Sequence, residues 1–574
     1  MPKQKKSATK LTLLQWIDKN LLLILSSFLI AFIPLYPKLP LFEAIPGYIV
    51  RVRLEDILIL LTGIVWLVQV LRKKISFQTP LTKIVIAYAV VGILSTLSAV
   101  FITQTVPFQP LHVGKTLLHY FRYLEYFTLF FFLYSAIKTR KDLQIVLGTV
   151  LTTLILVAAY GIGQKYLYWP VYSTMNREFS KGIRLYLTEH ARVQSTFGGH
   201  YDLAGYLVVV LPLILAMLYA AQKKLHQVTL WTVFLLGLWL LVVSGARTSF
   251  ISFLLAAGLV IGLRTLDLKT WKEKIVFVLK KGSVLIVILA TMMLTFGDDM
   301  YERLLQTLEG YPAIYQPYTQ TVSQTKWVLT DYIPTQLGMT EDTKDRIKSG
   351  KLADKPENSL STEEAAVMVA SDQQPSQDNP SDNTDRPSDV YTDIPDKKTV
   401  ATISAEGTIE ITEIEVPRTY SENALRHGLS LAIRLDTLWP RALDGFYKNP
   451  LLGSGYATLT KETVGQFTEA ESTDNNFLRT LGETGLLGFV TFYGAVVIAV
   501  VWAVRIWKKA QPNTLARGLA IGFIAATAGL LLNATYIDVF AASKVAFTYW
   551  SVAGIVLAIL GKELLTESNK SKKS

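Results

Sequence analysis

A polar segment that leads into an apolar run holds the residues best suited to chemistry. Asp474 and Asn475 end a long polar region, and the apolar run that begins at Leu486 follows closely. An aspartate of ordinary pKa, about 3.9, is a weak base at neutral pH. Asp474 would therefore orient a hydroxyl group, or would need desolvation to become a stronger base. The structural alternative is that Asp474 only caps a helix that starts at Asn475.

A second candidate base is His200, which lies in a polar break before another apolar run. Gly198 and Gly199 precede it and permit an unusual backbone, and the next span is expected to begin at Leu203. Histidine changes its charge near neutral pH and often transfers protons. The alternative is a histidine that is merely hydrogen-bonded.

Two arginines lie close to expected membrane edges and could bind an anion. Arg192 belongs to the basic segment 164–202, and Arg247 lies in the turn 244–249 between two apolar runs. A charged side chain costs about 2.5 to 3.5 kcal/mol at the centre of a membrane helix and less near the interface, so its presence favours a partner. Guanidinium groups stay protonated and bind phosphate oxygens in a fork. The alternatives are a solvated loop and, for Arg247, contact with lipid phosphates.

Four segments resemble the O-antigen ligase and polymerase family of membrane glycosyltransferases. Residues 473–489 are similar to the family's signature, in which a His-Asn or Asp-Asn pair precedes a Leu-x-x-Leu-x-Glu-x-Gly-Leu-Leu-Gly run. Residues 192–207 and 244–249 resemble the family's Arg turn and Ser-Arg element. Residues 449–456, with the sequence Asn-Pro-Leu-Leu-Gly-Ser-Gly-Tyr, resemble its loop pattern.

The resemblance implies a donor in which a glycan is linked to a polyprenyl diphosphate. Arg192 and Arg247 would then bind the diphosphate, and Arg434 would be a further contact to diphosphate or sugar. Arg441 lies in the same part of the family's pattern and is a fourth candidate. Arginines can neutralise a departing diphosphate without a metal, so no metal and no cofactor are expected.

The acceptor implied by the resemblance is a hydroxyl group on a glycan, a lipid or a protein. Transfer with inversion needs a group that accepts the hydroxyl proton. The ligase branch has a His where this chain has Asp474, so Asp474, His200 and the neighbouring Asn475 are the candidate catalytic residues.

The elements that must position these residues are membrane helices. The chain has 574 residues, of which 51% are hydrophobic and 18% are charged, whereas soluble domains are about 25% charged. About twelve apolar segments are long enough to cross a bilayer. We therefore expect an all-α polytopic membrane protein, and the resemblance implies a relation to the GT-C-type membrane glycosyltransferases.

Basic residues predict the topology. They cluster at the ends of spans rather than along one face, which argues against nucleic acid as a partner. Clusters lie in alternate connections, which places both termini and all these clusters in the cytoplasm: residues 3–10, 72–74, 138–141, 223–224, 264–274, 505–509 and 570–573. The expected location is the cytoplasmic membrane.

Three regions are expected along the chain. Residues 1–296 contain about nine spans, and residues 484–574 contain about three. Between them, residues 297–483 form a loop outside the cytoplasm with helical ends at 300–308 and 424–447. Within this loop the polar insert 339–398 has few aromatic residues and is expected to be disordered, and residues 399–416 alternate like a hairpin.

Two other classes of function remain open. A glycolipid transporter or flippase would also have many spans and membrane arginines, but it predicts inverted repeats and broken helices, which the sequence does not display. A surface adhesin or receptor would place the function in the large loop. The chain has no cysteine, which excludes disulfides and thiolate chemistry.

Overall fold

Long apolar helices account for most of the described chain. The computed structural model describes residues 13–45, 51–175, 179–188, 191–297, 327–340, 396–403, 409–416, 419–459 and 472–560, with single positions between 300 and 344. The long helices are α1 (Leu13–Leu35), α2 (Leu54–Leu71), α3 (Thr82–Phe101), α4 (Pro110–Ala136), α5 (Arg140–Leu167), α6 (His200–Ala220), α7 (Lys224–Val243), α8 (Arg247–Thr265), α9 (Trp271–Phe296), α18 (Asn476–Lys509), α19 (Leu515–Asn533) and α20 (Ser543–Leu557).

Ten of these helices, counted within the described residues, are long and apolar enough to cross a membrane. The chain is therefore a multi-pass membrane protein. Helices α4 and α20 fall outside this count, since α4 carries charged residues and α20 is shorter, yet α20 packs against both α4 and α6. The expected total of about twelve spans is reached only if these two helices also cross.

Helix α6 lies at the centre of the bundle. It is apolar on all sides, and 94% of its most apolar stretch is buried, compared with 11% for the peripheral α9. Helices α7, α8, α19 and α20 pack around it. Close contact with α19 depends on small residues, because a Cβ atom added to Gly522 would lie 2.7 Å from the Cα of Leu213.

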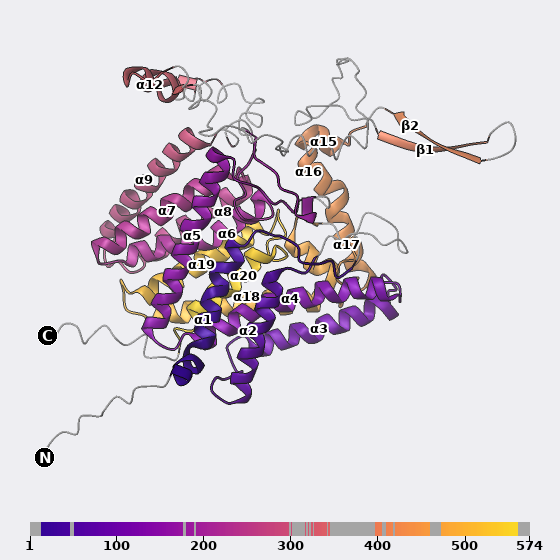
Figure 1. Cartoon of the computed structure of the whole chain (residues 1–574), viewed down its shortest axis with the longest axis horizontal. Helices are drawn as coiled ribbons and strands as arrows, with labels where there is room; N and C mark the ends of the chain where they lie inside the picture. The colour runs from indigo at the N-terminus through magenta and orange to yellow at the C-terminus, as the bar shows by residue number, and fades with distance from the viewer. Residues whose placement is uncertain are drawn as a thin grey trace.

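The described helices of the large region between α9 and α18 are η2 (Val328–Tyr332), α12 (Ile333–Gln336), α15 (Glu422–His427), α16 (Leu429–Ile433), η3 (Arg434–Leu438) and α17 (Trp439–Lys448), and the earlier connection between α5 and α6 contains η1 (Phe179–Lys181). The described elements α12, α15 and α16 lie at one side of the bundle (Figure 1). Residues 424–447, which the sequence predicts to be helical, contribute to α15, α16, η3 and α17. The other expected end, 300–308, and most of the insert 339–398 lie outside the described residues.

A hairpin is present where the alternating sequence predicts one. Strand β1 (Asp396–Ile403) pairs in antiparallel register with β2 (Ile409–Val416), and it starts three residues earlier than expected. The hairpin projects away from the bundle at the same side as α15 (Figure 1).

Helix α18 begins earlier than the predicted span and contains a kink. It starts at Asn476, inside the region 297–483 that was expected to be a loop, and the kink lies at Gly485, close to the expected start of the span. Gly485 has a φ of 64°, and a Cβ atom there would lie 2.4 Å from the carbonyl carbon of Leu451. The kink therefore needs glycine because the turn 449–455 packs directly against it. The amide of Leu486 also donates to the carbonyl oxygen of Pro450 at 2.9 Å.

Candidate functional site

The two residues of the Asp-Asn pair at the start of α18 differ in their roles, because only one of them caps the helix. Asn475 is the N-cap, since its side-chain oxygen accepts hydrogen bonds from the amides of Phe477 and Leu478, both at 3.1 Å. Asp474 precedes the cap and has a φ of 50°, which is unusual for a residue with a side chain. The cap is thus Asn475 and not Asp474, so the Asp474 carboxylate has no capping role.

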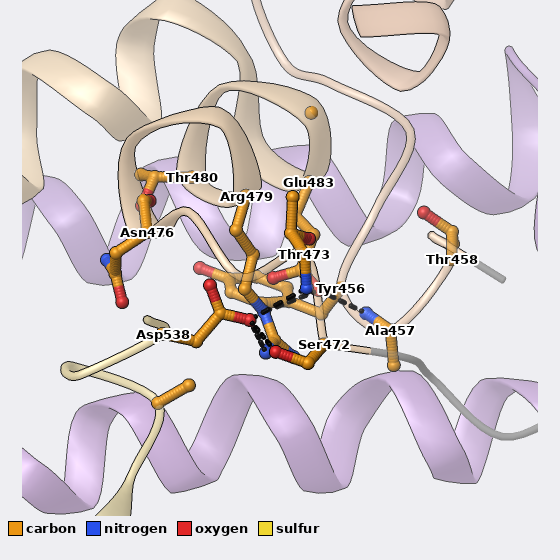
Figure 2. A network of polar contacts seen from close by, with 12 residues as sticks. Tyr456, Ala457, Thr458, Ser472, Thr473, Asn476, Arg479, Thr480, Glu483 and Asp538 are labelled. Atoms are coloured by element: carbon orange, nitrogen blue, oxygen red, sulfur yellow. Dashed lines mark hydrogen bonds and ion pairs between the residues drawn. The ribbon is translucent and has the colours of Figure 1, made fainter. Parts of the chain in front are cut away.

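Asp538, in the turn between α19 and α20, holds this pair in place through its backbone neighbours, and it lies close to Ser472 and Thr473 in Figure 2. One carboxylate oxygen, Oδ2, accepts from the Ser472 hydroxyl and the Thr473 amide, both at 2.9 Å. The other, Oδ1, accepts from the Asn475 amide at 3.1 Å. Asp538 therefore bonds to the backbone on both sides of Asp474, and it is only 6% exposed.

A buried arginine balances the charge of Asp538. Arg479 donates from Nη1 to Asp538 Oδ2 at 2.9 Å and from Nε to Glu483 Oε1 at 3.3 Å (Figure 2). The Ala457 amide also donates to Glu483 Oε1, at 3.2 Å. Glu483 therefore anchors the segment that follows the 449–455 turn. Buried charges persist when they are paired and hydrogen-bonded in this way.

Arg434 contacts the Asp474 side chain directly. Its Nη2 lies 2.9 Å from Asp474 Oδ2, and its Nη1 donates to the Ser430 carbonyl and hydroxyl oxygens at 2.6 and 2.9 Å. The guanidinium carbon lies 5.5 Å from the centre of the Tyr536 ring. Arg434 begins η3, a π-helical turn, and such turns are frequent at functional sites.

The environment of Asp474 makes it a better base than an isolated aspartate. Burial raises the pKa of its carboxyl above the ordinary 3.8, although the Ser472 hydroxyl and the Arg434 charge act in the opposite direction. Burial does so because a low-dielectric environment disfavours the charged form.

Arg192 and His200 form a second pair of a cation and a proton acceptor. Arg192 Nη1 lies 2.8 Å from His200 Nε2. Because a guanidinium group only donates, Nε2 must accept, and the imidazole is neutral with its proton on Nδ1. Arg192 also lies against the Ser-Arg turn, since a Cβ atom on Gly245 would lie 3.2 Å from its Cδ. Arg247 follows this turn as the first residue of α8, with an exposed side chain.

The segment that carries Arg192 and His200 is fixed by a buried lysine. Lys544, at the start of α20, is fully buried and donates to three carbonyl oxygens. These belong to Pro34 at 3.0 Å, Tyr36 at 2.7 Å and Thr196 at 2.8 Å. An ammonium group has three protons, so all of its donors are used.

The last residue of α19 and the turn after it contact both α8 and Arg434. On one side, Asn533 Nδ2 donates to the Ser249 hydroxyl at 3.0 Å, two residues into the helix that begins at Arg247. On the other side, Tyr536 lies under Arg434. The starts of α6, α8, α18 and α20 therefore meet at one end of the bundle.

The structure thus brings most of the predicted residues to one end of the bundle, where they form two pairs, and the two residues of each pair contact each other. Arg434 pairs with Asp474, Arg192 pairs with His200, and Asn475 caps the adjacent helix. Arg441 is half-buried on α17 and follows Arg434 by seven positions in the sequence. No group of three or more His, Cys, Asp or Glu residues within the described chain is arranged to hold a metal ion.

Sequence reasoning did not single out Asp538, Arg479 or Lys544. Each is a charged residue next to, or within, an apolar run, and that isolation was the available signal. The partners of Asp538 and Lys544 lie far away in the sequence, so these contacts could not be read from spacing, whereas the Arg479–Glu483 pair has the i,i+4 spacing of a helix face.

Comparison with models of known protein families finds no match, and no curated protein matches the chain.

Proposed function

We propose that this protein is a membrane glycosyltransferase of the O-antigen ligase or polymerase type. It would transfer a glycan from a polyprenyl-diphosphate-linked donor to an acceptor hydroxyl at the outer face of the cytoplasmic membrane. The observation that carries the proposal is the meeting, at one end of a membrane bundle, of two pairs that each join an arginine to a proton acceptor: Arg434 with Asp474, and Arg192 with His200. A relation to the GT-C-type fold and a large loop outside the cytoplasm belong to the same proposal.

The arginines would bind the diphosphate of the donor. Guanidinium groups remain charged at all physiological pH values and form two parallel hydrogen bonds to phosphate oxygens. As the bond between the anomeric carbon and the diphosphate oxygen breaks, negative charge grows on the leaving diphosphate, and Arg192, Arg247 and Arg434 would stabilise it. The polyprenyl chain would remain in the surrounding lipid.

Asp474 is the better candidate for the proton acceptor. His200 Nε2 already accepts a hydrogen bond from Arg192, so that lone pair is occupied. The pKa of Asp474 is raised by burial, which strengthens the carboxylate as a base. In the proposed reaction, Asp474 takes the proton of the acceptor hydroxyl while the acceptor oxygen bonds to the anomeric carbon from the opposite side. His200 would orient Arg192.

Reconstitution into vesicles tests the proposal. The full chain would be supplied with a polyprenyl-diphosphate-linked glycan and an acceptor glycan. Release of free polyprenyl diphosphate together with a lengthened acceptor supports transfer, whereas movement of the intact donor across the vesicle membrane supports a flippase. Arg505→Ala is a matched control, because Arg505 is an exposed arginine near the far end of α18.

A further inference from the structure

The contact between Arg434 and Asp474 joins a proposed anion-binding residue to the proposed base. In this state Arg434 Nη2 is occupied by a carboxylate oxygen at 2.9 Å. The same nitrogen cannot then offer its full donor capacity to a phosphate oxygen, and the carboxylate is stabilised as an anion rather than directed at a hydroxyl. The pair therefore satisfies both residues while no substrate is present.

Neighbouring groups fix the position of the Arg434 guanidinium group. Ser430 orients the guanidinium group through its carbonyl and hydroxyl oxygens, and the Tyr536 ring lies against its face. Within the part of the chain that the structure describes, the buried Nε atom of Arg434 has no hydrogen-bond partner. The guanidinium group is thus held in place from one side, and its unused Nε donor is buried rather than exposed to a ligand.

Asp474 is placed so that it can leave Arg434. Its side chain is 31% exposed, whereas that of Arg434 is 13% exposed. Its second oxygen, Oδ1, lies 2.8 Å from the Ser472 hydroxyl, whose single proton it shares with Asp538 Oδ2, so this hydroxyl can still donate to it when the contact with Arg434 is lost. The backbone next to it is fixed by Asp538, and only the side chain would need to rotate.

We infer that the diphosphate of the donor displaces Asp474 from Arg434, so that the carboxylate is released toward the acceptor only when the donor is bound. A diphosphate carries more negative charge than one carboxylate and can bind a guanidinium group through two oxygens, so it competes well for Arg434. This inference rests on the proposed function, because it assigns a diphosphate as the ligand. Its consequence is an order of events in which donor binding precedes activation of the acceptor hydroxyl.

The alternative is that Arg434 and Asp474 form a purely structural ion pair. The two readings differ in what happens when the carboxylate is neutralised. If Asp474 competes with the diphosphate, Asp474→Asn should strengthen anion binding. If the pair only holds the loop, the same change should leave anion binding unchanged and lower the stability.

The test is a titration of the purified full chain in detergent with inorganic pyrophosphate and, separately, with a short-chain isoprenyl diphosphate. Asp474→Asn should bind each ligand about fivefold more tightly than the unaltered protein, which corresponds to about 1 kcal/mol for a partly exposed pair. Arg434→Gln should weaken binding by about tenfold or more. In the Arg434→Gln background, Asp474→Asn should have no further effect, because the competition is then absent.

Asp436→Asn is the matched control. It also removes one negative charge, from the π-helical turn that carries Arg434, but the Asp436 carboxylate contacts Ser421 and Asn423 and not Arg434. Equal tightening in Asp436→Asn and Asp474→Asn would overturn the inference, since it would reduce the effect to net charge. Unchanged affinity in Asp474→Asn, or absence of binding to either ligand, would also overturn it.

The outcome can be separated from that of the proposed function. Binding is measured without turnover. Tighter binding in Asp474→Asn, together with no glycan transfer by the unaltered protein, would support the displacement and reject the transferase. Glycan transfer together with unchanged affinity in Asp474→Asn would do the reverse. Thermal unfolding of each variant in the same detergent verifies that it is folded.

Discussion

Removal of the Asp538 carboxylate should release the segment that carries Asp474. Asp538→Ala deletes hydrogen bonds to Ser472, Thr473, Asn475 and Arg479, three of them 2.9 Å long and one 3.1 Å long. Loss of one partner from a buried ion pair costs about 3 to 5 kcal/mol. We expect the lower end, about 3 kcal/mol, because Arg479 keeps a second carboxylate as its partner and water can reach the freed amides.

Two measurements examine this expectation. Equilibrium unfolding in detergent gives the change in free energy, and hydrogen exchange reports whether the amides of Thr473 and Asn475 lose protection. Asp436→Ala is the control, since Asp436 also accepts two side-chain hydrogen bonds but lies at the exposed surface of η3. We expect it to cost less than about 1 kcal/mol.

The reasoning would be refuted if Asp538→Ala were as stable as the control and the two amides kept their protection. Asp538→Asn gives an additional check. It preserves the shape and one acceptor oxygen but removes the charge that faces Arg479, so its cost should fall between those of the control and the alanine variant. A cost for Asp538→Asn equal to that of Asp538→Ala would assign the whole effect to charge rather than to the hydrogen bonds.

Three further predictions concern the arginines, the base and the packing. Arg192→Ala should lower the transfer rate by about 100-fold with little loss of stability, and Arg192→Lys should restore it only in part because lysine lacks the fork; wild-type turnover in Arg192→Ala would remove this residue from the site. The transfer rate should rise with pH through a value above 3.8, where Asp474 loses its proton, and this rise should vanish in Asp474→Asn; an unchanged profile would assign the base elsewhere. Gly522→Ala should cost about 1 to 3 kcal/mol in thermal unfolding, because its Cβ would meet Leu213, whereas Gly258→Ala, with nothing within 4 Å, should cost nothing.

The same raised pKa has a consequence for stability. A carboxyl that binds its proton more tightly in the folded chain than in the unfolded chain makes the folded state less stable as pH rises from 3.8 toward the native pKa of Asp474. Asp436 behaves in the opposite way, because hydrogen bonds from Ser421 and Asn423 lower the pKa of its carboxyl. Its contribution is present above 3.8 and is lost as pH falls through the lowered value.

The helices could be predicted from the sequence, because apolar runs of sufficient length have few alternatives in a membrane. The span expected from Leu203 lies within α6, which begins at His200, and the expected start at Leu486 lies next to the kink of α18. The start of α18 at Asn476 agrees with the alternative in which a helix begins at Asn475, but composition did not reveal the kink at Gly485. The hairpin was also predictable, since its two strands alternate around a turn.

The candidate site was only partly predictable. Residue types and motif spacing identified Arg192, His200, Arg434 and Asp474, but not which residue contacts which. Contacts between helix ends depend on how helices pack, and a single sequence does not encode these distances in any local pattern. Asp538 was missed for the same reason, because its importance comes from bonds to residues more than fifty positions away.

The three carbonyl bonds of Lys544 have a consequence for motion. Displacement of the Arg192 segment relative to the ends of α1 and α20 would leave the buried Lys544 side chain without hydrogen-bond partners, which costs free energy. The half of the site that contains Arg192 should therefore stay rigid throughout a reaction cycle. Adaptation to substrates of different sizes would then fall to the half built from α16, η3 and α17. This half consists of short helices and contains a partly exposed ion pair.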